Sequence, residues 1–157
     1  MTFWRMVMIY VVTVMLHWWL MTHVAIWGMS PNLVFISAFS CAALLGPVAG
    51  IIMSFLWGLY IDILGIGLMG GYALTYTLAA YFVFWFKQHM DVVSPFSQAI
   101  MAWIVSFVAL AFYQIIAVIF AHDVVMKWPR LIFEPFLNAA IAPFVFAVIR
   151  GIRSKNL

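Results

Sequence analysis

The stretch GPVAGIIMSFLWGLYIDIL, residues 46–64, combines a long apolar run with regularly spaced small residues and one acid. These occupy every fourth position: Gly46, Gly50, Ser54, Gly58 and Asp62, here called the small-residue row. Side chains four residues apart stack into one inclined ridge along a helix. The stretch therefore predicts a membrane-spanning helix whose backbone a second helix can approach closely, as small residues at this spacing allow.

The composition of the whole chain agrees with a membrane protein. Of its 157 residues, 69% are hydrophobic and 7% are charged, whereas soluble domains carry about 25% charged residues. So few polar residues could not cover a water-soluble domain of this size. We therefore expect an all-α integral membrane protein. The net charge of +3 comes largely from a basic C-terminus, which is typical of a membrane-flanking segment and predicts no nucleic-acid partner.

Six apolar runs emerge when the chain is divided at polar segments and at Gly and Pro, since a bilayer needs about 20 residues per helix. The expected spans, in one polytopic domain covering 1–157, are residues 4–27, 33–45, 48–64, 72–86, 95–121 and 131–149. The second run is short, which leaves open whether it crosses fully. We expect structural turns at Pro31, Asn32, Gly65, Gly70 and Gly71, with positive φ in the glycine-rich turn 65–71.

Six spans would place both termini on one side of the membrane. Five basic residues then fall on that side and two fall opposite: Arg5, Lys87, Arg150, Arg153 and Lys155 against Lys127 and Arg130. Because Lys and Arg accumulate in cytoplasmic loops, the distribution predicts cytoplasmic termini. Trp4, Trp27, Trp85 and Trp128 lie at predicted span ends, as in an interfacial aromatic belt.

Asp62 is costly in a membrane, because a carboxylate at the bilayer centre costs about 2.5–3.5 kcal/mol on insertion scales. Its place near the end of a span leaves three roles open. It could accept hydrogen bonds from the following turn and cap the next helix, contact a partner, or belong to a proton or cation relay. A relay needs several such groups, and we expect no other acid within a span, which favours the first two roles.

The small-residue row has two possible roles of its own. It could pack against another helix of the same chain, or it could receive the transmembrane helix of a partner protein. If it receives a partner, Gly58→Leu should abolish partner binding and leave membrane insertion intact.

We expect no catalytic residues, no metal site and no cofactor. His17 and His23 are six residues apart and point to different faces of a helix, and His89 and His122 fall on opposite sides. The spacing Gly65-x-Gly67-x-x-Gly70 occurs between two membrane helices, whereas a dinucleotide-binding turn follows a strand. No hydrolase motif is present. The protein is therefore not expected to be an enzyme.

Residues 31–81 carry a set of local signatures: Pro31-Asn32-Leu33-Val34, Gly50, Gly58-Leu59-Tyr60-Ile61-Asp62-Ile63-Leu64, Leu68, Gly70, Ala73, Leu74 and Ala80-Tyr81. In this order the segment resembles the MreD family of bacterial rod shape-determining proteins, above all in Gly-x-x-x-Asp followed by apolar residues. The C-terminal half, from about residue 92, offers no matching motif.

The resemblance implies a non-catalytic scaffold of the cell-elongation machinery in the bacterial inner membrane. Such proteins bind MreC, and through it join the glycosyltransferase RodA, its transpeptidase and MreB. We also expect the protein to contact membrane lipid. The resemblance also implies a fold similar to the substrate-binding components of energy-coupling-factor transporters.

That likeness keeps an alternative open, a solute-binding component of a vitamin-type transporter. Such a component needs several polar groups that converge on one cavity. The sequence offers few, on different segments: Asp62, Asn32, Gln98, Gln114 and Asn138. Gln98, Ser106 and Gln114 share one face of the fifth span only approximately, and such a weak polar face more often joins helices. We therefore expect no small-molecule ligand.

Overall fold

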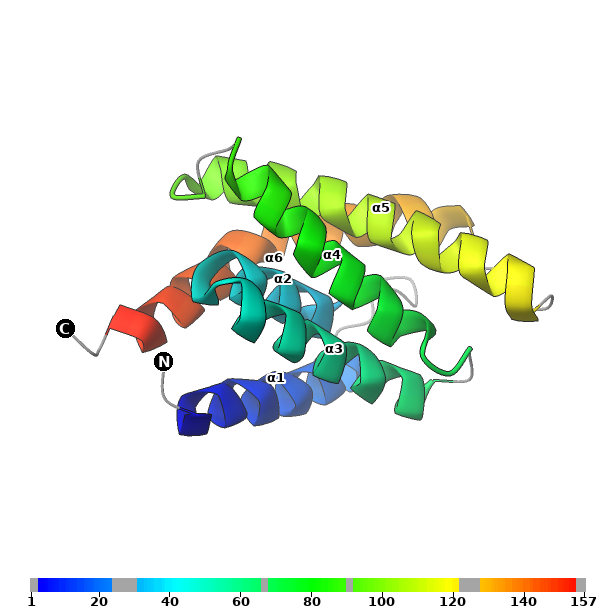
Figure 1. Cartoon of the computed structure of the whole chain (residues 1–157), viewed down its shortest axis with the longest axis horizontal. Coiled ribbons are helices and arrows are strands. Elements are labelled where there is room, and N and C mark those ends of the chain that lie inside the picture. Colours follow the sequence, from blue (N-terminus) through cyan, green and yellow to red (C-terminus); the bar gives the residue numbers. More distant parts are fainter. Residues whose placement is uncertain (1–2, 24–30, 66–67, 90–91, 122–127, 155–157) are drawn as a thin grey trace.

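A computed structural model describes residues 3–23, 31–65, 68–89, 92–121 and 128–154, and within these ranges every regular element is a helix (Figure 1). The helices are α1 (Phe3–His23), α2 (Leu33–Leu45), α3 (Pro47–Leu64), α4 (Gly71–Lys87), α5 (Pro95–Ala121) and α6 (Trp128–Ser154). The all-helical expectation and the number of helices are confirmed.

Three boundaries differ from those expected in a way that matters. The end of α6 is Ser154 and not 149, so Arg150 and Arg153 are helical. The start of α4 is Gly71, so this glycine is helical and buried. The start of α6 is Trp128, three residues before the expected 131, which brings Arg130 into the helix. Residue 27, the expected end of the first span, lies outside the described residues.

Three helices are long and apolar enough to cross a membrane by length and composition: Pro47–Leu64, Pro95–Phe120 and Pro129–Ser154. Two further apolar helices are shorter, Trp4–Leu20 and Leu33–Leu45. That all six helices cross stays a prediction.

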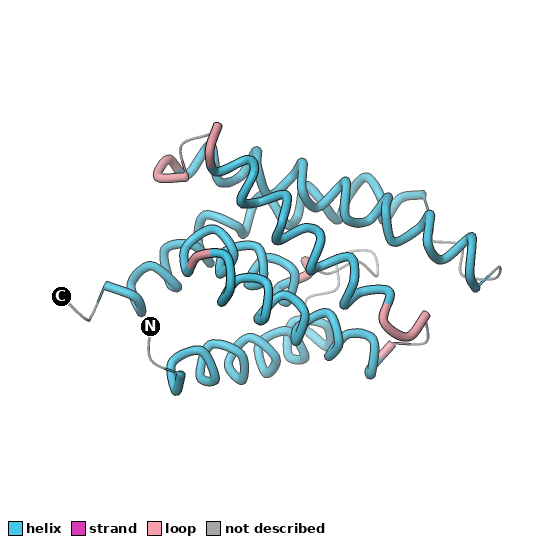
Figure 2. Tube along the Cα trace, in the orientation of Figure 1, coloured by secondary structure: helices cyan, strands magenta, loops and turns pink. Residues whose placement is uncertain are grey.

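The short helix α2 lies at the centre of the bundle (Figure 2). It packs against α1, α3, α4, α5 and α6, and its residues 34–43 are all buried. Small residues such as Ala38, Cys41 and Ala42 let the neighbouring helices approach it. Protein therefore surrounds this helix over residues 34–43.

Successive helices alternate in direction, so the bundle has two distinct ends. At one end, called the terminus end, Arg5 Nη1 donates to Ile152 O at 3.1 Å and Lys87 Nζ donates to Ala43 O at 2.6 Å. The start of α1 and the end of α6 both lie there (Figure 1). At the other end, called the network end, α2, α4 and α6 begin and α3 and α5 finish.

Candidate functional site

The small-residue row faces the interior of the protein. Gly50, Ser54, Gly58 and Asp62 are all buried. A Cβ added at Gly50 would lie 2.6 Å from Ala42 Cα in α2, and one added at Gly58 would lie 2.5 Å from Ala73 Cα in α4. Both distances are shorter than side chains tolerate, so glycine is required where α3 meets α2 and α4.

Gly46 differs from the rest of the row. It precedes α3 with φ +98°, and a Cβ there would meet nothing within 4 Å. Glycine is favoured at this position by the backbone conformation between α2 and α3, and not by close packing.

Asp62 caps the helix that follows it in the chain. Its Oδ1 accepts from the backbone N–H of Tyr72 and its Oδ2 from that of Ala73, both at 2.9 Å. These are the second and third residues of α4, whose N–H groups lack partners within their own helix. The residue that precedes α4 is Gly70, which has no side chain to offer. The carboxylate of Asp62, a residue of α3, therefore accepts hydrogen bonds from N–H groups in the first turn of α4 and lies at the positive end of the α4 dipole.

Gly58 and Asp62 act on the same turn of α4 from adjacent turns of α3. A Cβ at Gly58 would approach Tyr72 O to 2.6 Å and Ala73 N to 2.7 Å. The missing side chain thus brings the α4 backbone close, and the carboxylate one turn later accepts its two N–H groups. This geometry explains why a glycine and an acid occur four residues apart. It corresponds to the first of the three roles left open for Asp62.

The glycine-rich turn conforms only in part to the expectation of positive φ. Gly70 has φ +88°, as expected. Gly65 has φ −86°, so the expectation is wrong there. Gly67 lies outside the described residues. At Gly71 the constraint is packing, because a Cβ would lie 2.9 Å from the ring of Tyr113 in α5.

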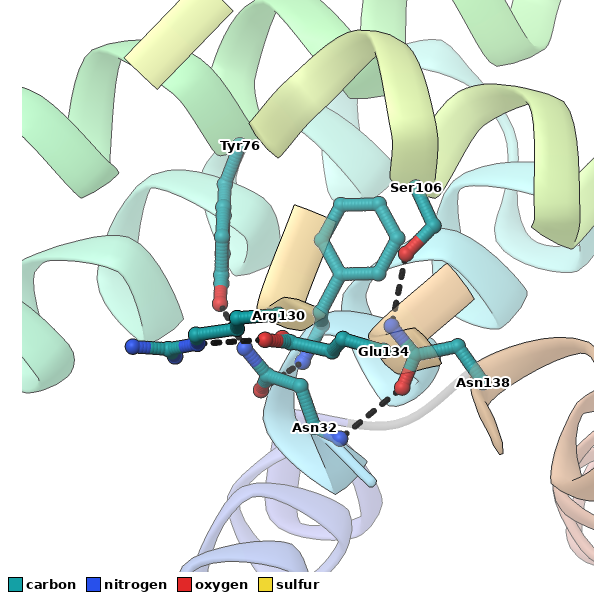
Figure 3. Close-up of polar contacts among 7 residues, drawn as sticks. Asn32, Tyr76, Ser106, Arg130, Glu134 and Asn138 are labelled. Atoms are coloured by element: carbon teal, nitrogen blue, oxygen red, sulfur yellow. Dashed lines mark hydrogen bonds and ion pairs between the residues drawn. The ribbon is translucent and has the colours of Figure 1, made fainter. Parts of the chain in front are cut away.

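A buried polar network joins four helices at the network end (Figure 3). The backbone N–H of Asn32 donates to Asn138 Oδ1 at 2.8 Å, and Asn32 Nδ2 donates to the Tyr76 hydroxyl at 2.8 Å. Asn138 Nδ2 donates to Ser106 Oγ at 2.6 Å. Asn32 also caps α2, since its Oδ1 accepts from Phe35 N at 3.0 Å. Asn32 is thus more than a turn residue: it connects α2 to α4 and α6.

Glu134 is the acid that the sequence interpretation missed. The expectation that no other acid lies within a span is wrong, because Glu134 belongs to α6 and is 3% exposed. Arg130 Nε donates to Glu134 Oε2 at 2.6 Å, and the arginine side chain is 46% exposed. Pairing offsets the charge of a carboxylate that would otherwise be buried alone. Arg130, Glu134 and Asn138 recur at every fourth position, a signal that the sequence contains.

The polar residues considered for a solute site do not converge. Asn32 and Asn138 bond directly, whereas Asp62 caps α4 and Gln98 donates to Val92 O at 2.8 Å at the terminus end. Ser106 belongs to the polar network, so it does not share a partner with Gln98. No three His, Cys, Asp or Glu side chains gather into a possible metal site within the described ranges.

A small cavity adjoins the polar network. It has room for about one water molecule. Its aromatic lining residues are Phe35, Tyr72, Tyr76 and Tyr113. Its polar or charged lining residues are Asn32, Thr75, Ser106 and Glu134, and Ala109 and Leu110 complete the lining.

Asn138→Leu should lower the free energy of unfolding by about 1–3 kcal/mol, because the buried N–H of Asn32 loses its acceptor. The measurement is unfolding of the purified protein in mixed micelles of mild detergent and sodium dodecyl sulfate. Phe144→Leu, on the exposed face of the same helix, is the control and should shift the curve little. Equal curves for Asn138→Leu and the wild type would contradict a stabilising role for the network.

A family model described as rod shape-determining protein MreD matches residues 1–152, which include α1 to α5 and α6 up to Ile152. No curated protein and no solved structure matches significantly. Proteins of this family are membrane proteins with a role in determining rod shape, and the family is not a known enzyme family. The match covers almost the entire chain, including Gly58 and Asp62, which contact the first turn of α4. This protein therefore belongs to the MreD family.

Proposed function

We propose that this protein is a non-catalytic scaffold of the bacterial cell-elongation machinery. It binds MreC and through MreC links RodA, its transpeptidase and MreB. The observation that carries the proposal is the family match over residues 1–152. The named partners come from the resemblance of residues 31–81. The structure supports a scaffold because the Asp62 carboxylate joins α3 to the start of α4, while Glu134 is paired with Arg130 within α6.

We also propose that all six helices, in a single domain, cross the inner membrane and that both termini are cytoplasmic. The charge distribution supports this orientation. Arg5, Lys87, Arg150 and Arg153 bond at the terminus end, whereas the described cation at the network end, Arg130, is paired with Glu134. An excess of positive charge marks the cytoplasmic side.

Within this proposal, Gly50, Ser54, Gly58 and Asp62 serve helix packing, and the partner contacts outward-facing surfaces of the bundle. Close contacts of Gly50 with α2 and of Gly58 with α4 support this assignment. Pro31, Asn32, Gly65, Gly70 and Gly71 shape the connections at the network end. The solute-binding alternative gains no support from the cavity beside the polar network, because a vitamin needs far more space than one water molecule.

Affinity purification of the full chain from native membranes tests the proposed partnership. We expect a periplasmic coiled-coil protein, MreC, at about equal stoichiometry. Recovery of a pair of cytoplasmic ATPases instead would favour the transporter alternative and contradict the scaffold.

Gly58→Ala distinguishes packing from docking in the same experiment. If the row packs internally, the variant yields less folded protein, but the MreC recovered per folded molecule stays unchanged. A variant that folds as well as the wild type and binds less MreC would show instead that the row is a docking surface. Gly151→Ala, where a Cβ meets nothing within 4 Å, is the matched control.

A further inference from the structure

Four basic side chains gather at the terminus end, and each donates to a main-chain carbonyl of another segment. The pairs are Arg5 with Ile152 O, Lys87 with Ala43 O, Arg150 with Val92 O and Arg153 with Leu44 O. The acceptors place the four groups together, because Ala43 and Leu44 are consecutive and Ile152 is next to Arg153. Arg150 lies one turn before Arg153 on α6. We call Arg5, Lys87, Arg150 and Arg153 the basic cluster.

The charge of this cluster is not balanced by carboxylates. Among the described residues, Arg130 with Glu134 is the one ion pair, and it lies at the network end. Asp91 follows α4 in the sequence and lies outside the described residues. If the charge of Asp91 is counted against the four cations, three positive charges remain in excess.

The four groups keep hydrogen-bond donors for a further acceptor. A guanidinium has five N–H donors and an ammonium has three. Each of the four groups uses a donor for the one main-chain carbonyl named above. The side chains of Lys87, Arg150 and Arg153 are exposed. An anion that approaches this end can therefore bond to several of them at once.

The cluster lies where the apolar part of the bundle ends. Lys87 and Arg153 bond to the last turn of α2, whose residues 34–43 are buried. Two exposed tryptophans, Trp4 and Trp85, are 76% and 55% exposed and lie one and two residues before basic members of the cluster. Tryptophan is enriched at the boundary between hydrocarbon and head groups. Both observations place the four cations at head-group level.

We propose that the basic cluster binds the phosphate head group of an anionic phospholipid such as phosphatidylglycerol. Arginine and lysine donate strong, charge-assisted hydrogen bonds to phosphate oxygens, and basic groups between membrane helices on the cytoplasmic side recognise anionic head groups. The acyl chains would lie along the exposed apolar side chains of the neighbouring helices. A zwitterionic lipid brings its own ammonium group, so it offers less attraction to an end with excess positive charge.

The test uses the full-length protein in mild detergent, titrated with dioleoyl-phosphatidylglycerol, with dioleoyl-phosphatidylcholine or with inorganic phosphate. Native mass spectrometry counts bound lipid, and thermal unfolding reports stabilisation. We expect phosphatidylglycerol to bind and to raise the melting temperature, with little effect of the other two. The double variant Arg150→Gln/Arg153→Gln should weaken phosphatidylglycerol binding roughly 30-fold at low salt, because two charges are lost.

Arg150→Lys/Arg153→Lys keeps both charges and should retain most of the binding, which separates charge from side-chain shape. If the glutamine variant fails to fold, a salt titration of the wild type replaces it, and phosphatidylglycerol binding should weaken steeply as salt rises. Equal affinity for phosphatidylcholine, wild-type affinity in the glutamine variant, or salt-independent binding would each overturn the proposal. Stabilisation by inorganic phosphate equal to that by the lipid would indicate a site for a free anion and would overturn it as well.

Discussion

Gly58→Leu is expected to leave a protein that inserts into the membrane but does not form the native bundle. Insertion depends on the hydropathy of α3, which leucine does not lower. Folding depends on contact between α3 and the start of α4, where even a Cβ would lie 2.5 Å from Ala73 Cα. The atoms in the way belong to the backbone of α4, so no side-chain rotation can make room. Loss of partner binding in this variant would therefore follow from loss of the fold.

Gly58→Ala gives the measurable form of this prediction. Overpacking of a tight site typically costs about 1–3 kcal/mol, which should appear as a lower free energy of unfolding in mixed detergent micelles. Gly151→Ala on α6 is the control, because its Cβ would meet nothing within 4 Å and alanine favours helix. If the two alanine variants have the same free energy of unfolding, α3 and α4 are not in contact at Gly58.

Asp62→Ala is expected to destabilise the protein by about 2–4 kcal/mol, because two N–H groups at the start of α4 lose their acceptors together. In the wild type, the N–H of Tyr72 donates to one oxygen of the Asp62 carboxylate and the N–H of Ala73 donates to the other. Asp62→Asn keeps one acceptor and should fall between the alanine variant and the wild type. Hydrogen–deuterium exchange should become faster in the first turn of α4. A general loss of stability would instead speed exchange throughout the protein.

Ile63→Ala serves as the control for Asp62, since Ile63 is the next residue and is 66% exposed. It should leave exchange in α4 unchanged. Wild-type stability and exchange in Asp62→Ala would show that the carboxylate has another role, and a partner contact would then become the first alternative.

The sequence predicted best what depends on local pattern. The number of helices follows from apolar runs and their Gly and Pro breaks, and the capping role of Asp62 was among those left open because the turn follows directly in the chain. The direction in which the small-residue row faces could not be derived. Spacing shows that a ridge exists, but close contacts with Ala42 and Ala73 arise only when α2 and α4 are placed.

Glu134 was missed for a different reason. This acid lies inside the expected span 131–149, so the sequence alone was enough to find it. Its pairing was hidden because Arg130 was assigned to a connection, and the spacing of Arg130, Glu134 and Asn138 did not stand out as one face of a helix. The central place of α2 was also hidden, because a short apolar run looks the same whether lipid or protein surrounds it. The partners of Asn32 lie 44 and 106 residues away, at Tyr76 and Asn138. No local pattern specifies such pairs.

The position of α2 has a consequence for the order in which the protein is made. This helix is the second to be synthesised, yet the side chains that satisfy its two ends, Tyr76, Lys87, Asn138 and Arg153, all belong to helices that follow it. A nascent chain that stops after α5 has its central helix exposed on the side of α6, with the N–H of Asn32 and the carbonyl of Leu44 unpaired. A part of the core that is made early is thus completed last, and the ribosome must release the final helix before α2 is fully enclosed.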